Sequence, residues 1–217
     1  MLNILALDMA CGEIAACVLR GNQPFLASTA ITPPHGKMRS TTIVPAIQTL
    51  LDQAELDWTQ LHGLVFGSGP GAFTGLRIAA ATLAGINAGL HLPVRHISSL
   101  AITARQTGLT GQESVHVLED ARAGEVFSGC YQNGNAIKAD TCLGWDTVAA
   151  MTPGLYCCHT EPPCALLPWT RIPLTLPRSE ALALLVQSSS EPDQQLTTYP
   201  APVYLQLSQA ERNLHAA

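Results

Sequence analysis

The spacing of apolar and polar residues divides the first half of the chain into strands and helices. Short apolar runs separated by polar turns predict three consecutive strands at Leu2–Asp8, Glu13–Leu19 and Gln23–Ala30, with tight turns that favour an antiparallel meander. Apolar residues at helical spacing predict one helix from Thr41 to about Ala54 and a longer one from Phe73 to about Gly89.

Two further short apolar runs, Leu64–Gly67 and Val94–Ile97, predict strands, and a helix is expected to end near Gln106. The resulting order β-β-β-α-β-α-β-α indicates an α/β architecture. A segment rich in Gly and Thr at Thr107–Gly111 predicts a boundary between a lobe of residues 1–106 and a smaller, more divergent lobe of residues 107–217. In the second lobe we expect strands at Ser114–Leu118, Glu125–Tyr131 and Leu155–His159, a hairpin turn at Asn133–Gly134, and helices at Trp145–Met151 and Ser179–Ser188.

Composition narrows the class of protein. Of the 217 residues 47% are hydrophobic and 12% charged, which predicts a buried core and excludes intrinsic disorder. The net charge is −5 and no basic run is present, so the chain is not expected to hold a nucleic acid alone.

Two apolar runs could be mistaken for a targeting or membrane segment. The first is short and ends at Asp8, and the second, Ile78–Leu90, is interrupted by Thr82 and Asn87. Neither fits a signal peptide or a membrane span, and we expect a soluble, cytoplasmic protein with reduced cysteines.

The segment after the predicted strand Leu64–Gly67 is a glycine-rich loop that opens the long helix. It contains Gly67, Gly69, Pro70 and Gly71, followed by Phe73, Thr74 and Arg77. Backbone amides at the start of a helix can bind an anion, so phosphate binding is one interpretation. The loop matches neither the P-loop, nor the dinucleotide fingerprint, nor the nucleophile elbow, so a purely structural turn is the other interpretation.

The long helix carries small residues at a spacing of four, Ala81, Gly85 and Gly89. A glycine within a helix costs about 1 kcal/mol relative to alanine, so a compensating close approach is expected. The helix packs closely either on its own sheet or on another subunit. In the second case the interface is expected to include Ile43, Ile47, Leu50 and Gly75 as well.

The motif G-x-G-P-G-x-F-T-G-L-R-I over Gly67–Ile78 resembles the signature loop of the TsaB (YeaZ) family. Ile4–Asp8 resembles the opening strand of that family, Asp120–Phe127 its D-A-R-x-G-E-V-Y hairpin, and Pro202–Leu205 its C-terminal P-x-Y-L-R. The chain departs from the family pattern at Arg39, where a histidine is usual, at Asp8–Met9, and at Gln206.

The resemblance implies an actin-like (RNase-H-like) two-lobe α/β fold with a degenerate second lobe. It implies a non-catalytic scaffold of the bacterial complex that makes N6-threonylcarbamoyladenosine at position 37 of ANN-decoding tRNAs. The expected partners are the catalytic paralogue TsaD and, through the complex, the ATPase TsaE. A homodimer is an alternative assembly, and tRNA is expected to be reached only through the complex. No cofactor is expected to bind this subunit tightly, although ATP or ADP could bind at the complex interface.

The candidates for chemistry are few. None of the seven histidines stands four residues from another, so neither a metal site nor peptidase activity is expected. Asp8 and Asp120 each end a predicted strand where actin-like ATPases place an acid, so an ATP-dependent phosphotransferase that uses Asp8 and the glycine loop is a second hypothesis. A homodimeric structural protein is a third. In the alternative interpretations, Asp8 caps the turn after its strand and Asp120 forms a hairpin ion pair with Arg122.

Overall fold

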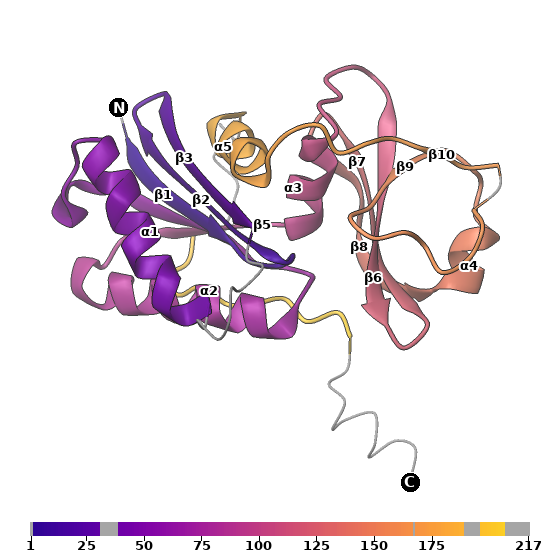
Figure 1. The fold of residues 1–217 in the computed structure, drawn as a ribbon, viewed down its shortest axis with the longest axis horizontal. Helices are drawn as coiled ribbons and strands as arrows, with labels where there is room; N and C mark the ends of the chain where they lie inside the picture. Colours follow the sequence, from indigo (N-terminus) through magenta and orange to yellow (C-terminus); the bar gives the residue numbers. More distant parts are fainter. Residues whose placement is uncertain (1, 31–38, 167, 189–195, 207–217) are drawn as a thin grey trace, which may run out of the picture.

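The structure, a computed structural model, describes residues 2–30, 39–166, 168–188 and 196–206 (Figure 1). Two five-stranded sheets stand side by side, and two helices fill the space between them. This arrangement forms two lobes with a shared central layer.

The first sheet has the order β3-β2-β1-β4-β5. Its strands are β1 (Asn3–Asp8), β2 (Glu13–Arg20), β3 (Gln23–Ala30), β4 (Gly63–Gly67) and β5 (Val94–Ile97). The first three pair antiparallel, as the meander predicted, because tight turns join them. The last two run parallel to β1, since helical crossovers connect them.

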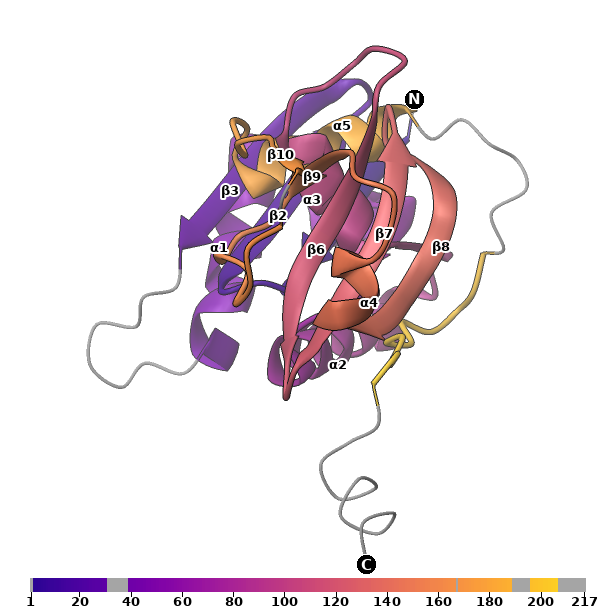
Figure 2. The same cartoon turned by 90° about the vertical axis from the view of Figure 1, so that its right-hand side faces the viewer.

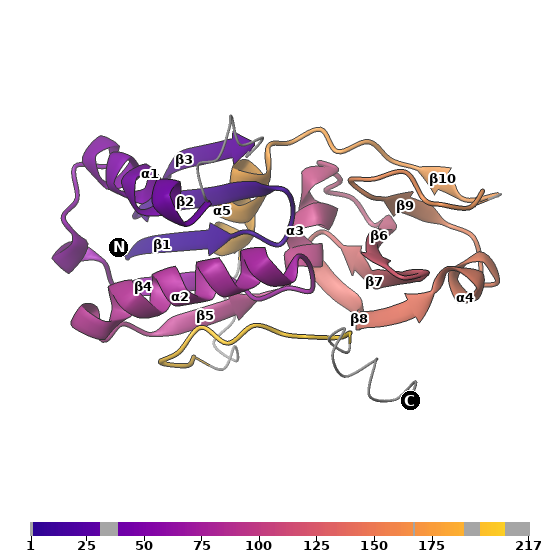
Figure 3. The ribbon, with the colours of Figure 1, turned by 60° about the horizontal axis from the view of Figure 1, so that its bottom comes forward.

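Successive side chains of this sheet pack alternately into two separate hydrophobic cores, one on each face. Leu5 and Leu7 of β1 pack against α1 (Arg39–Gln53) and α2 (Phe73–Leu90), which cover one face (Figure 3). Ala6, between them, faces α3 (Ser99–Gln106) and α5 (Arg178–Ser188) on the other face. Successive side chains of a strand point to opposite faces, so β1 is buried on both sides.

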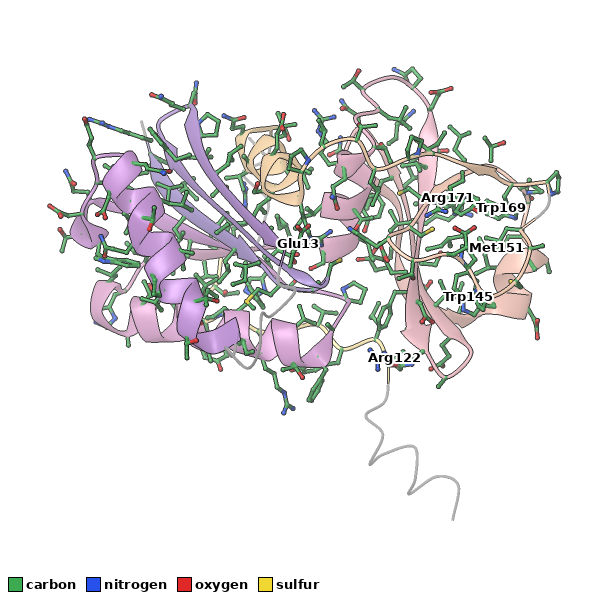
Figure 4. All side chains as sticks on the ribbon, viewed as in Figure 1. Glu13, Arg122, Trp145, Met151, Trp169 and Arg171 are labelled. Atoms are coloured by element: carbon green, nitrogen blue, oxygen red, sulfur yellow. The ribbon has the colours of Figure 1, made fainter. Side chains whose placement is uncertain are left out.

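The second sheet has the order β10-β9-β6-β7-β8. Its inner face packs on α3 and α5, and its outer face packs on α4 (Trp145–Ala149) and the segment around Trp169 (Figures 2 and 4). The strands are β6 (Ser114–Arg122), β7 (Glu125–Gln132), β8 (Asn135–Gly144), β9 (Leu155–Cys157) and β10 (Thr170–Arg171); a short 3-10 helix, η1 (Trp58–Gln60), lies in the first lobe.

Two expectations need correction. β8 was not predicted as a strand, because it is an edge strand with mostly exposed, polar residues and no apolar alternation. The expected second lobe of residues 107–217 is too long, since α5 returns to pack on β2 and β3. Thr197 then bridges to Val94 of β5, so α5 and the segment around Thr197 both pack on the first sheet.

By length and composition alone, α2 is long and apolar enough to cross a membrane, although the sequence suggested that its apolar stretch was too short. One such helix is weak support for a membrane protein. Here one third of the helix is buried, including Ala79, Ala80 and Leu83, which pack on the first sheet.

Candidate functional site between the lobes

A cavity of about 720 Å³ opens between the two lobes. The first lobe lines it with the turn after β1, the glycine loop and the start of α3. The second lobe contributes the β6–β7 hairpin and the segment after β9. The carboxyl ends of β1 and β4 point into this region, which is where ligands bind in α/β sheets.

A fully buried ion pair lies beneath the cavity. The Arg178 guanidinium donates from Nε to Asp8 Oδ1 at 2.7 Å, and both side chains have no exposed surface. Asp8 also accepts a hydrogen bond from Ser99 Oγ at 2.6 Å. The remaining guanidinium nitrogens donate to Thr103 Oγ1, Gln106 Oε1 and the Ser99 carbonyl at 2.9–3.0 Å.

This network keeps the guanidinium of Arg178 protonated. Burial by itself lowers the pKa of Arg178, but Asp8 and the nearby Cys11 and Glu119 outweigh it, and the pKa is raised. Both carboxylate oxygens of Asp8 are occupied inside the protein. Asp8 therefore joins β1 to α3 and α5, and its carboxylate does not reach the cavity as a magnesium ligand would.

The glycine loop is held by its own neighbours. Ser68 N donates to the Ile97 carbonyl at 2.9 Å, Gly69 N to Ser99 Oγ at 3.0 Å, and Ala72 N to the Ala10 carbonyl at 2.8 Å. These amides are the groups that a phosphate cradle would need free. Gly67 is required by packing, because a Cβ there would lie 2.2 Å from Asp8 Oδ2. A Cβ at Gly71 would lie 2.6 Å from the Ala10 carbonyl oxygen. These contacts favour the structural interpretation of Gly67, Gly69, Pro70 and Gly71.

The loop also starts an exposed ridge along α2. Phe73, Arg77, Ala81, Gly85 and Gly89 follow one another at intervals of four residues, and all are exposed. Gly85 and Gly89 have open space where a Cβ would point. At the loop end of the ridge, the Arg77 guanidinium stacks 3.7 Å above the Phe73 ring.

Tyr204, from the C-terminal segment, completes this end of the ridge. Its ring lies 5.2 Å from Phe73, and Arg77 Nε donates to its hydroxyl at 3.3 Å. Thr74, the other loop residue singled out, is exposed and lines the cavity.

Four residues of the expected interface do not lie on the surface. Ile43, Ile47 and Leu50 are buried in the chain's own core beneath α1, because they form the face of that helix that packs on the sheet. Gly75 is buried against the turn after β1, where a Cβ would lie 2.0 Å from the Met9 carbonyl oxygen. The prediction that these four contact a partner is wrong for this conformation, whereas Ala81, Gly85 and Gly89 are accessible.

Asp120 is exposed at the mouth of the cavity. Its carboxylate accepts a hydrogen bond from the backbone N–H of Arg122 at 3.0 Å. The expected ion pair with the Arg122 guanidinium is not among those of the described residues. The tight turn explains this, since Arg122 has a φ of 64° and its N–H, not its guanidinium, faces Asp120. Figure 4 shows Arg122 at the end of the second lobe that faces the first.

Sequence reasoning missed two features of the site. The first is Arg178, which begins α5, where the helix dipole disfavours a cation. A positive charge at this position was the sequence signal that could have indicated a buried acidic partner.

The second feature is a cluster of Cys11, Glu119 and His159, which are far apart in the sequence. His159 Nδ1 lies 2.6 Å from Glu119 Oε1 and 3.7 Å from Cys11 Sγ. Burial alone lowers the pKa of His159, but Cys11 and Glu119 outweigh it and raise the pKa to about 10.

Comparisons with known proteins agree with this fold. The family model of TsaD, tRNA N6-adenosine threonylcarbamoyltransferase, matches residues 34–152, more than half of the chain. The solved structure of YeaZ from Pseudomonas aeruginosa superimposes with a TM-score of 0.74 at 26% identity, covering 94% of this chain and 100% of that one. The chain belongs to the TsaD family and, within it, to the TsaB (YeaZ) group.

Two further members of the TsaB (YeaZ) group are similar in sequence or in structure. The tRNA threonylcarbamoyladenosine biosynthesis protein TsaB of Haemophilus influenzae is 34% identical over 128 residues, 58% of this chain and 52% of that protein. The chain thus matches about half the length of this curated relative. Another structure, described as an uncharacterized protein with similarity to the peptidase YeaZ from P. aeruginosa, has a TM-score of 0.71 at 27% identity and covers 95% of this chain and 100% of that one. Together with the two-sheet topology, these matches confirm the expected actin-like α/β fold class.

Proposed function

We propose that this chain is a non-catalytic scaffold subunit of the bacterial complex that makes N6-threonylcarbamoyladenosine at position 37 of ANN-decoding tRNAs. It pairs with TsaD, the catalytic paralogue, and meets the ATPase TsaE and the tRNA only within the complex. The names of its relatives support the pathway. The net charge of −5 supports an indirect contact with tRNA, because a chain that bound tRNA alone would need a basic surface. The complex is proposed to act in the cytoplasm, away from membranes.

The observation that carries the scaffold role is the exposed ridge of α2. Glycines within a helix lower its stability. No close packing within the chain requires Gly85 and Gly89, because neither has a neighbour within 4 Å where a side chain would point. Small residues at a spacing of four let a second helix approach closely. The Phe73–Arg77–Tyr204 cluster adds aromatic and arginine groups, which are the types that dominate interface energies.

The occupied carboxylate of Asp8 supports the non-catalytic part of the proposal. An ATP-dependent phosphotransferase would need an acid free to bind the magnesium of the nucleotide. Asp8 is instead neutralised by Arg178, and three amides of the glycine loop are bonded internally. We propose that no nucleotide binds tightly to this subunit alone, and that ATP or ADP binds only at the interface with a partner.

Replacing Gly85 with leucine is expected to weaken binding to TsaD by more than about tenfold, because the side chain holds the opposing surface away. The monomer is expected to keep its melting temperature or to gain stability, since leucine is a better helix former than glycine by roughly 0.8 kcal/mol and the space is open. Co-purification with TsaD of the same organism and thermal melting measure the two effects.

Gly111→Leu is the matched control, because Gly111 is also exposed with no neighbour within 4 Å but lies between α3 and β6. If Gly85→Leu bound TsaD as well as the parent and the control do, the ridge would not be the TsaD interface. Self-association at the ridge, measured by sedimentation without TsaD, is the outcome that would favour a homodimeric structural protein.

A further inference from the structure

The cluster of Cys11, Glu119 and His159 is assembled by the pairing of the second sheet. β6 and β9 run parallel, with Val115 opposite Leu155 and Val117 opposite Cys157. Continuing this register by two residues places Glu119 opposite His159. The hydrogen bond from His159 N to Glu119 Oε2, at 3.3 Å, agrees with that placement.

The same register sets the direction of the two side chains. Val117 and Cys157 are buried in the core that faces the first lobe. Because side chains two positions apart lie on the same face of a strand, Glu119 and His159 point toward the first lobe as well. Cys11, in the turn after β1, meets them there, and all three line the cavity.

Three ligand atoms of different kinds therefore converge. The thiol sulfur, one imidazole nitrogen and a carboxylate oxygen all lie within 4.8 Å of one another. The side chains of His159 and Glu119 are 27% and 14% exposed, and both line the cavity, so the cluster is partly buried but open to the cavity. Among the described residues, these three form the one such group of histidine, cysteine and acidic side chains.

A nucleophilic cysteine with a histidine base does not fit this geometry. In that arrangement the thiol and the orienting carboxylate bind opposite nitrogens of the imidazole ring. Here Cys11 and Glu119 both approach Nδ1 of His159. Convergence of two acidic ligands on one nitrogen is what a shared cation, placed among the three atoms, would require.

We propose that Cys11, Glu119 and His159 form a zinc site that joins the two lobes, with the fourth coordination position open to the cavity. Thiolate, imidazole and carboxylate are the ligands that zinc takes in proteins, and three protein ligands with one open position are typical of its non-structural sites. The expectation that the chain has no metal site rested on histidine spacing, which cannot detect ligands brought together from three segments.

The distances fit a tetrahedral ion after a small shift. Zn–S and Zn–N bonds of about 2.3 and 2.0 Å imply a sulfur-to-nitrogen distance of about 3.5 Å. The observed distance from Cys11 Sγ to His159 Nδ1 is 3.7 Å. The corresponding nitrogen-to-oxygen distance is about 3.4 Å, so Glu119 must move away from His159 by less than about 1 Å from its 2.6 Å hydrogen bond.

The charges also balance. Asp8 and Arg178 neutralise each other beneath the site. A Cys11 thiolate and the Glu119 carboxylate then neutralise one Zn²⁺, and binding releases the thiol proton and any proton on the imidazole to solvent.

The test is titration of the full chain, reduced and freed of metal by a chelator, with Zn²⁺ against a chromophoric competitor. One equivalent is expected to bind. Cys11→Ser, Glu119→Gln and His159→Gln are each expected to weaken binding on the order of 100-fold. Cys164→Ser, which removes an exposed thiol outside the cluster, is expected to bind like the parent.

Absorption spectra with Co²⁺ in place of Zn²⁺ identify the ligands of the metal ion. The parent chain is expected to show a thiolate-to-metal charge-transfer band and the visible bands of a tetrahedral ion, and Cys11→Ser is expected to lose the charge-transfer band. Circular dichroism verifies that each variant is folded. Absence of a stoichiometric Zn²⁺ site in the parent, or a charge-transfer band that persists in Cys11→Ser and disappears in Cys164→Ser, would overturn the proposal.

Discussion

Replacing Arg178 with methionine is expected to lower the free energy of unfolding by about 3–5 kcal/mol. The substitution leaves the Asp8 carboxylate fully buried with no cation beside it. It also removes the guanidinium N–H groups that donate to Thr103 Oγ1, Gln106 Oε1 and the Ser99 carbonyl. These three acceptors therefore lose a hydrogen-bond partner together. Urea denaturation followed by circular dichroism measures the loss.

Arg171→Met is the matched control for this prediction. Arg171 also pairs with an acid, Glu161, but both side chains are substantially exposed, at 39% and 74%. Solvent screens such a pair, and its removal is expected to cost at most about 1 kcal/mol. Equal losses for Arg178→Met and Arg171→Met would contradict the claim that the buried pair joins β1 to α5.

Asp8→Asn distinguishes the structural role of this acid from a catalytic one. It leaves the guanidinium of Arg178 buried without a counter-charge, so it is expected to destabilise the fold about as strongly as Arg178→Met. In a double-mutant cycle the two losses are expected to be strongly non-additive, since both remove one interaction. An Asp8→Asn chain of unchanged stability that lost binding of Mg-ATP would instead favour the phosphotransferase hypothesis.

Gly75→Ala is expected to destabilise the chain by roughly 3 kcal/mol, at the upper end of the range for overpacking. The new Cβ would lie 2.0 Å from the Met9 carbonyl oxygen and 3.1 Å from its carbon. Both are backbone atoms of the turn after β1, and the preceding residue, Asp8, is held by its ion pair with Arg178. Neither α2 nor this turn can therefore move away without loss of core packing.

The same substitution at Gly85 is the control. Gly85 lies in the same helix with no neighbour within 4 Å, so alanine there is expected to raise stability by roughly 1 kcal/mol. Opposite signs at the two glycines would show that one is needed for packing within the chain and the other is not. A gain of stability in Gly75→Ala would contradict the packing of α2 on the Met9 turn.

The fold of the first lobe could be predicted from sequence because its signals are local. Periodicity located β1 to β5, α1, α2 and α3 to within a few residues. The hairpin turn at Asn133–Gly134 was also found, and both residues have a positive φ, as such turns require. β8 could not be found, since an edge strand with little buried surface carries no alternating pattern.

The site could be predicted only in part, because its key contacts are long-range. Asp8 and the glycine loop were identified as important, but the partner of Asp8 is Arg178, 170 positions later in the chain. Ile43, Ile47 and Leu50 were placed at an interface because an apolar helix face looks the same whether it packs on the chain's own sheet or on another subunit. Cys11, Glu119 and His159 meet only through the register of β6 with β9 and the closure of the lobes.

The chain departs from the TsaB family pattern at three positions, and the structure shows the contacts of the residue present at two of them. Gln206, in place of the usual arginine, donates to the Ala121 carbonyl at 2.9 Å and so fastens the C-terminal segment to the β6–β7 hairpin. Met9, in place of threonine, is buried in the first core. Arg39 begins α1, and its side chain lies outside the described part of the chain.

Threonylcarbamoyl transfer to tRNA, reconstituted from TsaD and TsaE of the same organism with Mg-ATP and an activated threonylcarbamoyl donor, tests the scaffold role most directly. No product is expected from this chain alone, and the parent chain is expected to stimulate TsaD strongly. Gly85→Leu is expected to lose that stimulation, whereas Gly111→Leu is expected to keep it. Product formed by the isolated chain, or undiminished stimulation by Gly85→Leu, would contradict the scaffold role.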